Sequence, residues 1–294
     1  MRDFRRFEVG SLLIPVGNVE NICFFNSLEH YSTLIFKNNI ELVKRLENFY
    51  CRYVYKSGDV IILSGFEVDE YFYRTGTLIY LDGNLDIIKK KSYLNFFSEI
   101  FWSDGIVCCG NSYKKDENKM NGDIFYVDNF ERIKLPVMLT GEYELRGGIK
   151  LDEGYLFFGV DKDNYRGIVV KLFGGNTELL DIDLENDLWD FVKIGNYDGK
   201  VILCGNKWSR IGFEGFVLFL EGDDKFDVYN ISLSSSWYEV IDMKVNDFIT
   251  LSVFDYDTNL GMLLEFNDGE FNILERNYKS QYIFGSDGIF LKKL

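Results

Sequence analysis

The chain has 294 residues, 47% of them apolar, and a formal net charge of −15. This length can bury the core of one large domain. The excess of acidic residues argues against a nucleic acid partner, because phosphate binding needs clustered Lys and Arg. No run approaches the roughly 18 apolar residues of a membrane-spanning helix, and no apolar segment of secretory length follows the N-terminus. We therefore expect a soluble, cytoplasmic protein without membrane insertion.

The residue types favour strands over helices. The sequence contains no alanine, which is the best helix former, and it is rich in aromatic and β-branched residues. Few Gln and His residues and many Asn, Lys, Ile, Tyr and Phe are typical of an AT-rich genome. Only two prolines occur, Pro15 and Pro136, and no Pro/Ser-rich linker divides the chain. We expect one all-β domain over residues 1–294.

Short apolar runs separated by turn signals recur along the whole chain. Residues 4–9 predict a first strand. Units of four strands, a to d, follow over residues 11–47, 48–93, 94–140, 141–185, 186–233 and 234–278. Turns rich in Gly, Asp and Asn connect a to b and c to d tightly, whereas the b–c and d–a connections are longer. The C-terminal segment, 279–294, supplies only strands a and b.

The repeat has a regular period. The a–b turns at Gly58, Gly105, Gly154, Gly199, Asp247 and Gly288 are 47, 49, 45, 48 and 41 residues apart. Four strands in a unit of about 47 residues are typical of a β-propeller. The chain resembles that superfamily over nearly its whole length. The repeats lack the WD40 and kelch signatures, so no subfamily is assigned.

The two ends of the chain predict how the ring closes. The N-terminal strand resembles a d strand, and the C-terminal hairpin lacks strands c and d. We expect these segments to form one three-stranded blade of a seven-bladed propeller, which closes the ring and removes two exposed sheet edges. A six-bladed ring is the alternative.

The b–c and d–a connections of a propeller share one face, here called the loop face, around the mouth of the central channel. Sites of propellers usually lie there. The predicted b–c loops, which include 66–75, 111–121, 161–166, 206–214 and 254–259, are rich in aromatic and Arg side chains, which are good binding anchors. The candidate binding residues are Tyr71, Tyr73, Arg74, Tyr113, Tyr165, Arg166, Trp208 and Arg210. Packing of these side chains onto their own blades is the alternative.

Four acidic residues follow the start of strand a: Glu99, Glu144, Asp190 and Glu239. Strand a is innermost in a propeller, so these carboxylates are expected at the channel mouth, although their offsets from the a–b turns differ. A ring of carboxylates could bind a cation or supply the acid and base for glycoside hydrolysis. Independent solvated or ion-paired acids are the alternative.

Aromatic residues open most of the a strands. Trp189 and Trp237 are found where other units have Phe49, Phe97 or Tyr143. An aromatic residue at the same place in every unit indicates packing between blades, because a ligand site needs only one or two blades.

Other metal or catalytic chemistry has little support in the sequence. Asp255, Asp257 and Asn259 have the spacing that opens an EF-hand loop, but the later Gly and Glu positions do not match, which favours an Asx turn. Five cysteines without CxxC spacing indicate buried apolar residues. His30 is the only histidine, which excludes a multi-His metal centre. We expect no cofactor.

These features favour binding over catalysis and leave an enzyme open. We expect a non-catalytic scaffold that binds a protein or peptide on the loop face, with the negative charge favouring a basic partner. One alternative is a carboxylate-based enzyme acting on glycans, which requires converging, unpaired acids. The other is a structural component of a viral or cell-surface assembly, which requires a large self-complementary surface. The scaffold requires exposed aromatic side chains in the loops.

Overall fold

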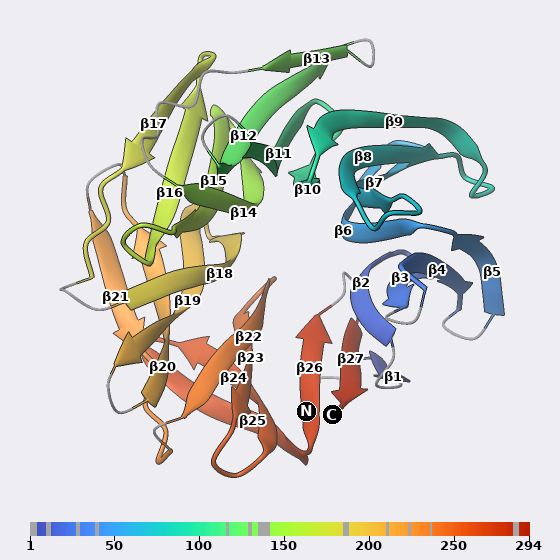
Figure 1. Ribbon diagram of the computed structural model, residues 1–294. Coiled ribbons are helices and arrows are strands. Elements are labelled where there is room, and N and C mark those ends of the chain that lie inside the picture. The colour runs from blue at the N-terminus through green and yellow to red at the C-terminus, as the bar shows by residue number, and fades with distance from the viewer. Residues whose placement is uncertain are drawn as a thin grey trace.

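The structure is a computed structural model that describes residues 5–9, 13–27, 30–38, 41–115, 118–128, 131–134, 142–184, 188–209, 212–222, 225–235, 237–284 and 288–294. Every regular element in these ranges is a β-strand, and the strands form a β-propeller, as the sequence predicts (Figure 1). None of the described residues belongs to a helix that is long and apolar enough to cross a membrane.

Four separate sheets contain four antiparallel strands each. The first two sheets comprise β2 (Leu13–Val19), β3 (Ile22–Ser27), β4 (Ser32–Lys37) and β5 (Glu41–Leu46), then β6 (Phe49–Ser57), β7 (Val60–Val68), β8 (Arg74–Leu81) and β9 (Ile87–Phe96). The other two comprise β18 (Leu188–Tyr197), β19 (Lys200–Ser209), β20 (Gly212–Leu220) and β21 (Phe226–Asn230), then β22 (Tyr238–Val245), β23 (Ile249–Asp255), β24 (Leu260–Asn267) and β25 (Glu270–Tyr278).

Two further groups of four strands are joined into one eight-stranded sheet. They comprise β10 (Ser98–Ser103), β11 (Val107–Lys114), β12 (Lys119–Asp128) and β13 (Glu131–Lys134), then β14 (Tyr143–Leu151), β15 (Gly154–Asp161), β16 (Arg166–Phe173) and β17 (Asn176–Leu180). The junction is a single parallel pair, Asn121 of β12 opposite Tyr143 of β14. Each group keeps its own four-stranded order.

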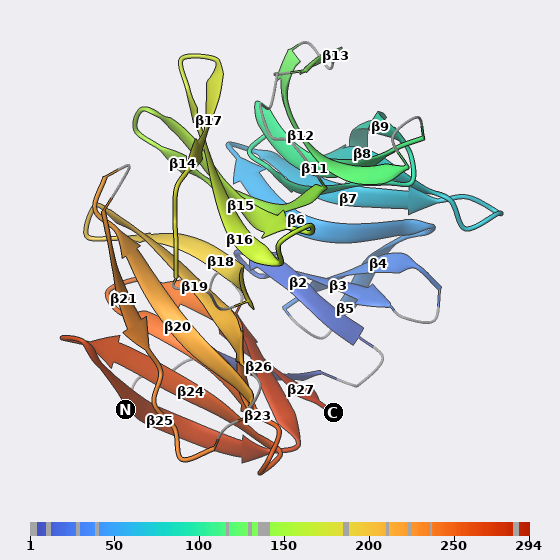
Figure 2. The same cartoon turned by 60° about the vertical axis from the view of Figure 1, so that its left-hand side comes forward.

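The position of each strand in its group explains its sequence pattern. The first strand of each group lies toward the centre and the fourth lies outside (Figure 1). Central strands such as β19 are buried on both faces, so their sequences contain continuous apolar runs. The outermost strand β25 is mostly exposed. Figure 2 shows the sheets of β18–β21 and β22–β25 beside each other.

The hydrophobic core lies between neighbouring sheets, in spaces here called joints. Leu203 and Phe216 of one sheet pack with Phe158 of the preceding sheet, and all three are buried. Trp189 is buried to 1% exposure in the same joint, so its predicted packing role is confirmed. Burying one such side chain is worth about 1.5–3 kcal/mol, so the joints supply the main stabilising term.

The N-terminal strand takes an unusual place. β1 (Arg5–Val9) runs parallel to β27 (Gly288–Lys293), which pairs antiparallel with β26 (Ser280–Phe284). In a complete group the fourth strand runs parallel to the second. β1 therefore has the direction of a fourth strand, as its sequence predicts, but lies directly beside the second strand, in the place that a third strand would occupy.

The b–c connections are shorter than the sequence predicts. The predicted loop 66–75, for example, includes the end of β7 and the start of β8, so only residues 69–73 connect them. Four of the candidate binding residues, Arg74, Tyr113, Arg166 and Trp208, consequently lie in strands. Backbone pairing continues past the apolar runs because it does not require apolar side chains. Hydropathy alone therefore places these strand ends too early.

A β-bulge interrupts the innermost strand in all six four-stranded groups. The extra residues are Val16, Arg52, Phe101, Arg146, Val192 and Ile241. A bulge increases the local twist and changes the direction of a side chain. Four of these residues, those of β6, β10, β14 and β18, line a cavity in the central channel.

Buried asparagines connect alternate pairs of sheets at these bulges. Asn26, Asn111 and Asn206 each donate a side-chain hydrogen bond to one backbone carbonyl of the next innermost strand and accept one from the N–H of the same residue. That residue directly precedes the bulge in each case, as Val240 does for Asn206. An innermost strand is a sheet edge, so the amide satisfies backbone groups that have no neighbouring strand on that side.

We expect the substitution Asn206→Ala to destabilise the protein by about 2–4 kcal/mol, because it leaves a buried N–H and a buried C=O without partners. Chemical denaturation measures the change in the free energy of unfolding. The matched control is Asn230→Ala on the exposed end of β21, with an expected effect within about 0.5 kcal/mol. Equal effects of the two substitutions would contradict the role of this hydrogen-bond pair.

Candidate functional site

A cavity of about 460 Å³ lies at the loop face and is here called the mouth pocket. Three neighbouring groups of strands, β6–β9, β10–β13 and β14–β17, contribute its wall. The lining residues are Arg52, Phe72, Arg74, Phe97, Glu99, Phe101, Asn111, Met120 and Glu144. The pocket therefore combines charged groups of both signs with several apolar side chains.

Glu99 is held by two arginines from the preceding sheet. Arg52 donates to Glu99 Oε2 from Nε at 3.0 Å and from Nη2 at 2.7 Å, and Arg74 donates to Oε1. The Arg52 guanidinium carbon also lies 5.1 Å from the ring centre of Tyr50 and 5.5 Å from that of Phe66. Two cations thus share one carboxylate against aromatic rings, which fixes their geometry.

The other mouth acids also have partners. Asp190 accepts a hydrogen bond from Arg146 Nη1 at 2.6 Å, and Lys162 Nζ lies 3.2 Å from Glu144 Oε1. Glu239 accepts one from the Tyr256 hydroxyl at 2.7 Å. The converging, unpaired acids that a carboxylate enzyme requires are therefore not found at these four positions. Within the described ranges, no group of three or more His, Cys, Asp or Glu residues could hold a metal ion.

The four acids occupy equivalent positions, contrary to the uneven offsets in the sequence. Each acid lies two residues before the extra residue of the bulge. The residues opposite them on the second strand are Asn111 for Glu99, Val160 for Glu144, Asn206 for Asp190 and Phe254 for Glu239. The number of residues between each acid and its a–b turn varies, because the turns and strands differ in length. The spacing between each acid and the bulge is constant. Counting from the bulge would have aligned them.

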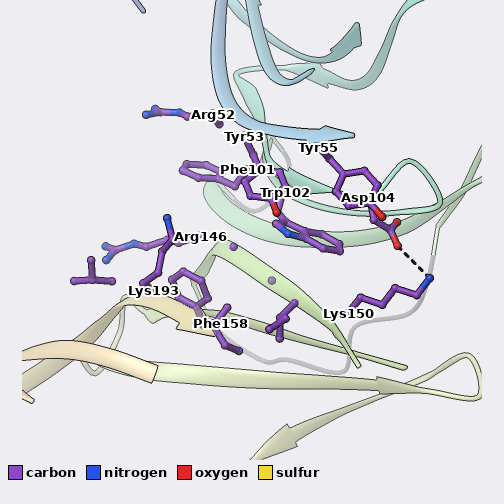
Figure 3. Close-up of a pocket in the computed structure, with 15 residues that line it drawn as sticks. Arg52, Tyr53, Tyr55, Phe101, Trp102, Asp104, Arg146, Lys150, Phe158 and Lys193 are labelled. Atoms are coloured by element: carbon purple, nitrogen blue, oxygen red, sulfur yellow. Dashed lines mark ion pairs between the residues drawn. The ribbon is translucent and has the colours of Figure 1, made fainter. Parts of the chain in front are cut away.

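A second cavity, of about 400 Å³, is lined mainly by residues of β6, β10, β14 and β18 and is here called the channel cavity (Figure 3). Arg52 and Phe101 line both cavities. Its other charged lining residues are Asp104, Arg146, Lys150 and Lys193, and its aromatic ones are Tyr53, Tyr55, Trp102 and Phe158. Lys193 Nζ lies 3.2 Å from Asp242 Oδ1, and Lys150 Nζ lies 4.0 Å from Asp104 Oδ2.

Burial and neighbouring charges shift the pKa values of Asp190 and Lys193. Burial raises the pKa of Asp190, and the nearby Glu239 adds to this effect, whereas Arg146 opposes it. The Asp242 carboxylate raises the pKa of Lys193, which burial opposes. Lys193 therefore stays charged at neutral pH, whereas burial disfavours the ionised form of Asp190.

The predicted loop residues divide into exposed and packed side chains. Tyr71 and Tyr165 are 68% and 60% exposed. Tyr73 contacts Tyr71 and Phe97 at ring-centre distances of 6.3 and 5.1 Å, and Tyr113 contacts Phe97 at 6.2 Å.

The remaining predicted residues lie at strand ends. The Arg166 guanidinium lies 4.0 Å from Asp183, and the half-buried Trp208 packs against Phe213. Arg210 lies outside the described residues.

Exposed aromatic residues are also found outside the candidate list. Phe72, Phe97 and Trp237 are 71%, 40% and 46% exposed. The assignment of Trp237 and Phe97 to the packing position of Trp189 is wrong, because Tyr238 and Ser98 open the strands and are buried there. Two adjacent aromatics, as in Trp237-Tyr238, leave the alignment ambiguous by one residue.

The calcium-like spacing forms an Asx turn. Asp255 accepts hydrogen bonds from the backbone N–H of Asp257 and from the hydroxyls of Thr258 and Ser235, at 2.8–2.9 Å. Its carboxylate is thus surrounded by donors from the protein itself.

All five cysteines are buried and unpaired with one another, as the sequence predicts. Burial raises the pKa of the Cys108 thiol to about 12, which leaves it unreactive at neutral pH.

The comparisons with known proteins identify the fold alone. No protein-family model matches the chain, and no curated protein matches it. Among solved structures, the β-propeller domain of Cps50 (Swd1) from Myceliophteria thermophila is 7% identical, with a TM-score of 0.60, covering 97% of this chain and 91% of that one.

Two similar structures are enzymes by their names. The periplasmic gluconolactonase PpgL of Pseudomonas aeruginosa is 11% identical, with a TM-score of 0.55, covering 95% of this chain and 88% of that one. A dihydro-heme d1 dehydrogenase, NirN, is 13% identical, with a TM-score of 0.55 over 94% of this chain. The chain spans 60% of the NirN chain. At these identities, the architecture is what is shared.

The raised pKa of Asp190 gives a prediction for stability. The folded state binds the Asp190 proton more tightly than the unfolded chain does, so ionised Asp190 opposes folding at neutral pH. This unfavourable contribution disappears as the pH falls from above the folded pKa to below the ordinary value of 3.8. We therefore expect Asp190→Asn to be at least as stable as the wild type at pH 7, with the difference shrinking toward pH 3.8.

Urea unfolding of both proteins between pH 4 and pH 7 measures this difference directly. If the substitution destabilised the protein at pH 7 and the loss diminished on acidification, the ion pair with Arg146 would outweigh burial. That result would contradict the raised pKa.

Proposed function

We propose that this protein is a non-catalytic binding module that holds a protein or peptide on its loop face. The observation that carries the proposal is a rim of exposed aromatic side chains in the b–c and d–a connections and at the end of β25. The rim consists of Tyr31, Tyr71, Phe72, Phe97, Tyr165, Trp237, Tyr256 and Tyr278. Among the described residues, Phe173 is the one aromatic of comparable exposure elsewhere.

The rim is continuous over the first three groups of strands. Tyr31 contacts Phe72 at a ring-centre distance of 6.3 Å, and Tyr73 links Tyr71 to Phe97. Phe72 and Phe97 also line the mouth pocket. Contiguous exposed aromatic surface beside a pocket is typical of a protein or peptide interface, because aromatic anchors bury much area at modest entropic cost.

The mouth acids support binding over hydrolysis. Glu99 and Asp190 are only 13% exposed and form ion pairs with arginines of the preceding group of strands. A carboxylate that neutralises a neighbouring arginine is poorly suited to act as a general acid. Glu144, which pairs with Lys162, also lines the mouth pocket, and the chain has a net charge of −15, so a peptide with a basic side chain is the partner that we propose.

We further propose that the chain is one domain with a closed ring of seven blades. The sheet of β1, β27 and β26 would be the seventh. Tyr282 and Phe284 of β26 pack against Leu263 of the preceding sheet. On the other side, Ile283 packs against Cys23 and Phe25 of the first sheet. Apolar clusters also fill the five joints between the other sheets.

Selection from a displayed peptide library tests the binding function. We expect the wild-type protein to enrich peptides that combine aromatic with Lys or Arg residues. A double variant, Tyr71→Ser with Phe72→Asn, should bind those peptides at least about tenfold more weakly, since it removes two adjacent anchors. Asn is chosen because Phe72 has a positive φ of 63°, which Asn tolerates.

The matched control removes two exposed apolar side chains from the opposite face, Ile106→Ser with Phe173→Ser. This control should retain full affinity. Failure to enrich any peptide, or an equal loss in both double variants, would contradict binding at the loop face.

A further inference from the structure

The bulged innermost strands direct cations into the channel and place their counter-ions in the joints. Arg52, Arg146 and Lys193 line the channel cavity and are 32%, 32% and 46% exposed. Their partners Glu99, Asp190 and Asp242 are 13%, 13% and 9% exposed. Each carboxylate belongs to the group of strands that follows its cation. The surface that a ligand would meet in the channel is therefore cationic, in a protein with a net charge of −15.

Two of these cations keep unused donors. Arg146 donates from Nη1 to Asp190, and within the described residues its guanidinium has no other hydrogen-bond partner. The Lys193 ammonium has three donors, and Asp242 is its one partner in that part of the chain. Figure 3 shows both residues beside the open space of the cavity, on β14 and β18. The arrangement leaves N–H donors available to an anion.

The rest of the wall is aromatic. Tyr53 and Trp102 lie with ring centres 6.0 Å apart, and Trp102 packs edge-on against Tyr155 behind it. Tyr53 on β6 and Lys193 on β18 both line the channel cavity, so aromatic and cationic groups share its wall. A volume of about 400 Å³ is within the range of small-molecule pockets.

We propose that the channel cavity binds a small organic anion, with its carboxylate or phosphate group at Arg146 and Lys193 and a flat apolar body against Trp102 and Tyr53. The ligand would enter past Arg52 and Phe101, which line both cavities. This site is separate from the loop face, so it does not depend on the binding function proposed above.

Isothermal titration calorimetry at low ionic strength tests the proposal with four probes: benzoate, phenyl phosphate, benzamide and inorganic phosphate. We expect saturable binding of benzoate or phenyl phosphate, and whichever binds more tightly identifies the preferred acid group. Neutral benzamide should bind at least about tenfold more weakly than benzoate, because it lacks the charge. Inorganic phosphate should bind at least about tenfold more weakly than phenyl phosphate, because it lacks the apolar body.

A double variant locates the site. Arg146→Gln with Asp190→Asn removes one ion pair without leaving an unpaired charge, and should weaken binding of the preferred anion at least about tenfold. The matched control, Lys200→Gln with Glu221→Gln, removes an exposed ion pair near the a–b turn and should have no effect. Unfolding midpoints confirm that each variant is folded.

Three results would overturn the proposal. They are the absence of saturable binding by either aromatic anion, equal affinities for benzoate and benzamide, and an unchanged affinity in the Arg146→Gln, Asp190→Asn variant. Inorganic phosphate binding as tightly as phenyl phosphate would overturn the assignment of an apolar body.

Discussion

The bulge in each innermost strand is the constraint on which the rest of this propeller depends. One extra residue at the same place in all six four-stranded groups shifts the pairing register there. The shift turns Arg52 and Arg146 toward the channel. Each arginine then contacts an acid on the innermost strand of the next group. Without the extra residue, the side chains after it would exchange faces. The composition of the channel wall is thus a consequence of backbone geometry.

Two kinds of polar connection alternate at the bulges, and the joint between the fifth and sixth groups also contains the Lys193–Asp242 ion pair. Hydrogen bonds between one asparagine amide and the backbone of the next group join the first group to the second, the third to the fourth and the fifth to the sixth. Arginine–carboxylate pairs join the second to the third and the fourth to the fifth. Both kinds of connection lie beside the bulge, and both supply partners to polar groups near the mouth of the channel. Glu99 and Asp190 are therefore counter-ions of arginines, and Glu239 accepts a hydrogen bond from the Tyr256 hydroxyl.

The sequence predicts the propeller because its period and turn chemistry are local signals. It predicts the burial of Trp189 and the cysteines for the same reason. The asparagine connection was missed, although Cys109-Gly110-Asn111 and Cys204-Gly205-Asn206 repeat the same three residues in one strand position. The pairing of Arg52 with Glu99 spans 47 residues and follows from the bulge, which has no hydropathy signature. Exposed Trp237 was mistaken for a packed residue because buried Tyr238 follows it.

The central claim is that the bulged strands make the channel of an acidic protein cationic and aromatic. Nuclear magnetic resonance with phenyl phosphate tests it most directly, through the side-chain N–H signals of Arg146 and Trp102. The account predicts that both signals shift together and saturate at the same ligand concentration, while the backbone signal of Tyr71 at the loop face stays in place. Shifts confined to the loop face, or no shift at Arg146 and Trp102, would contradict it.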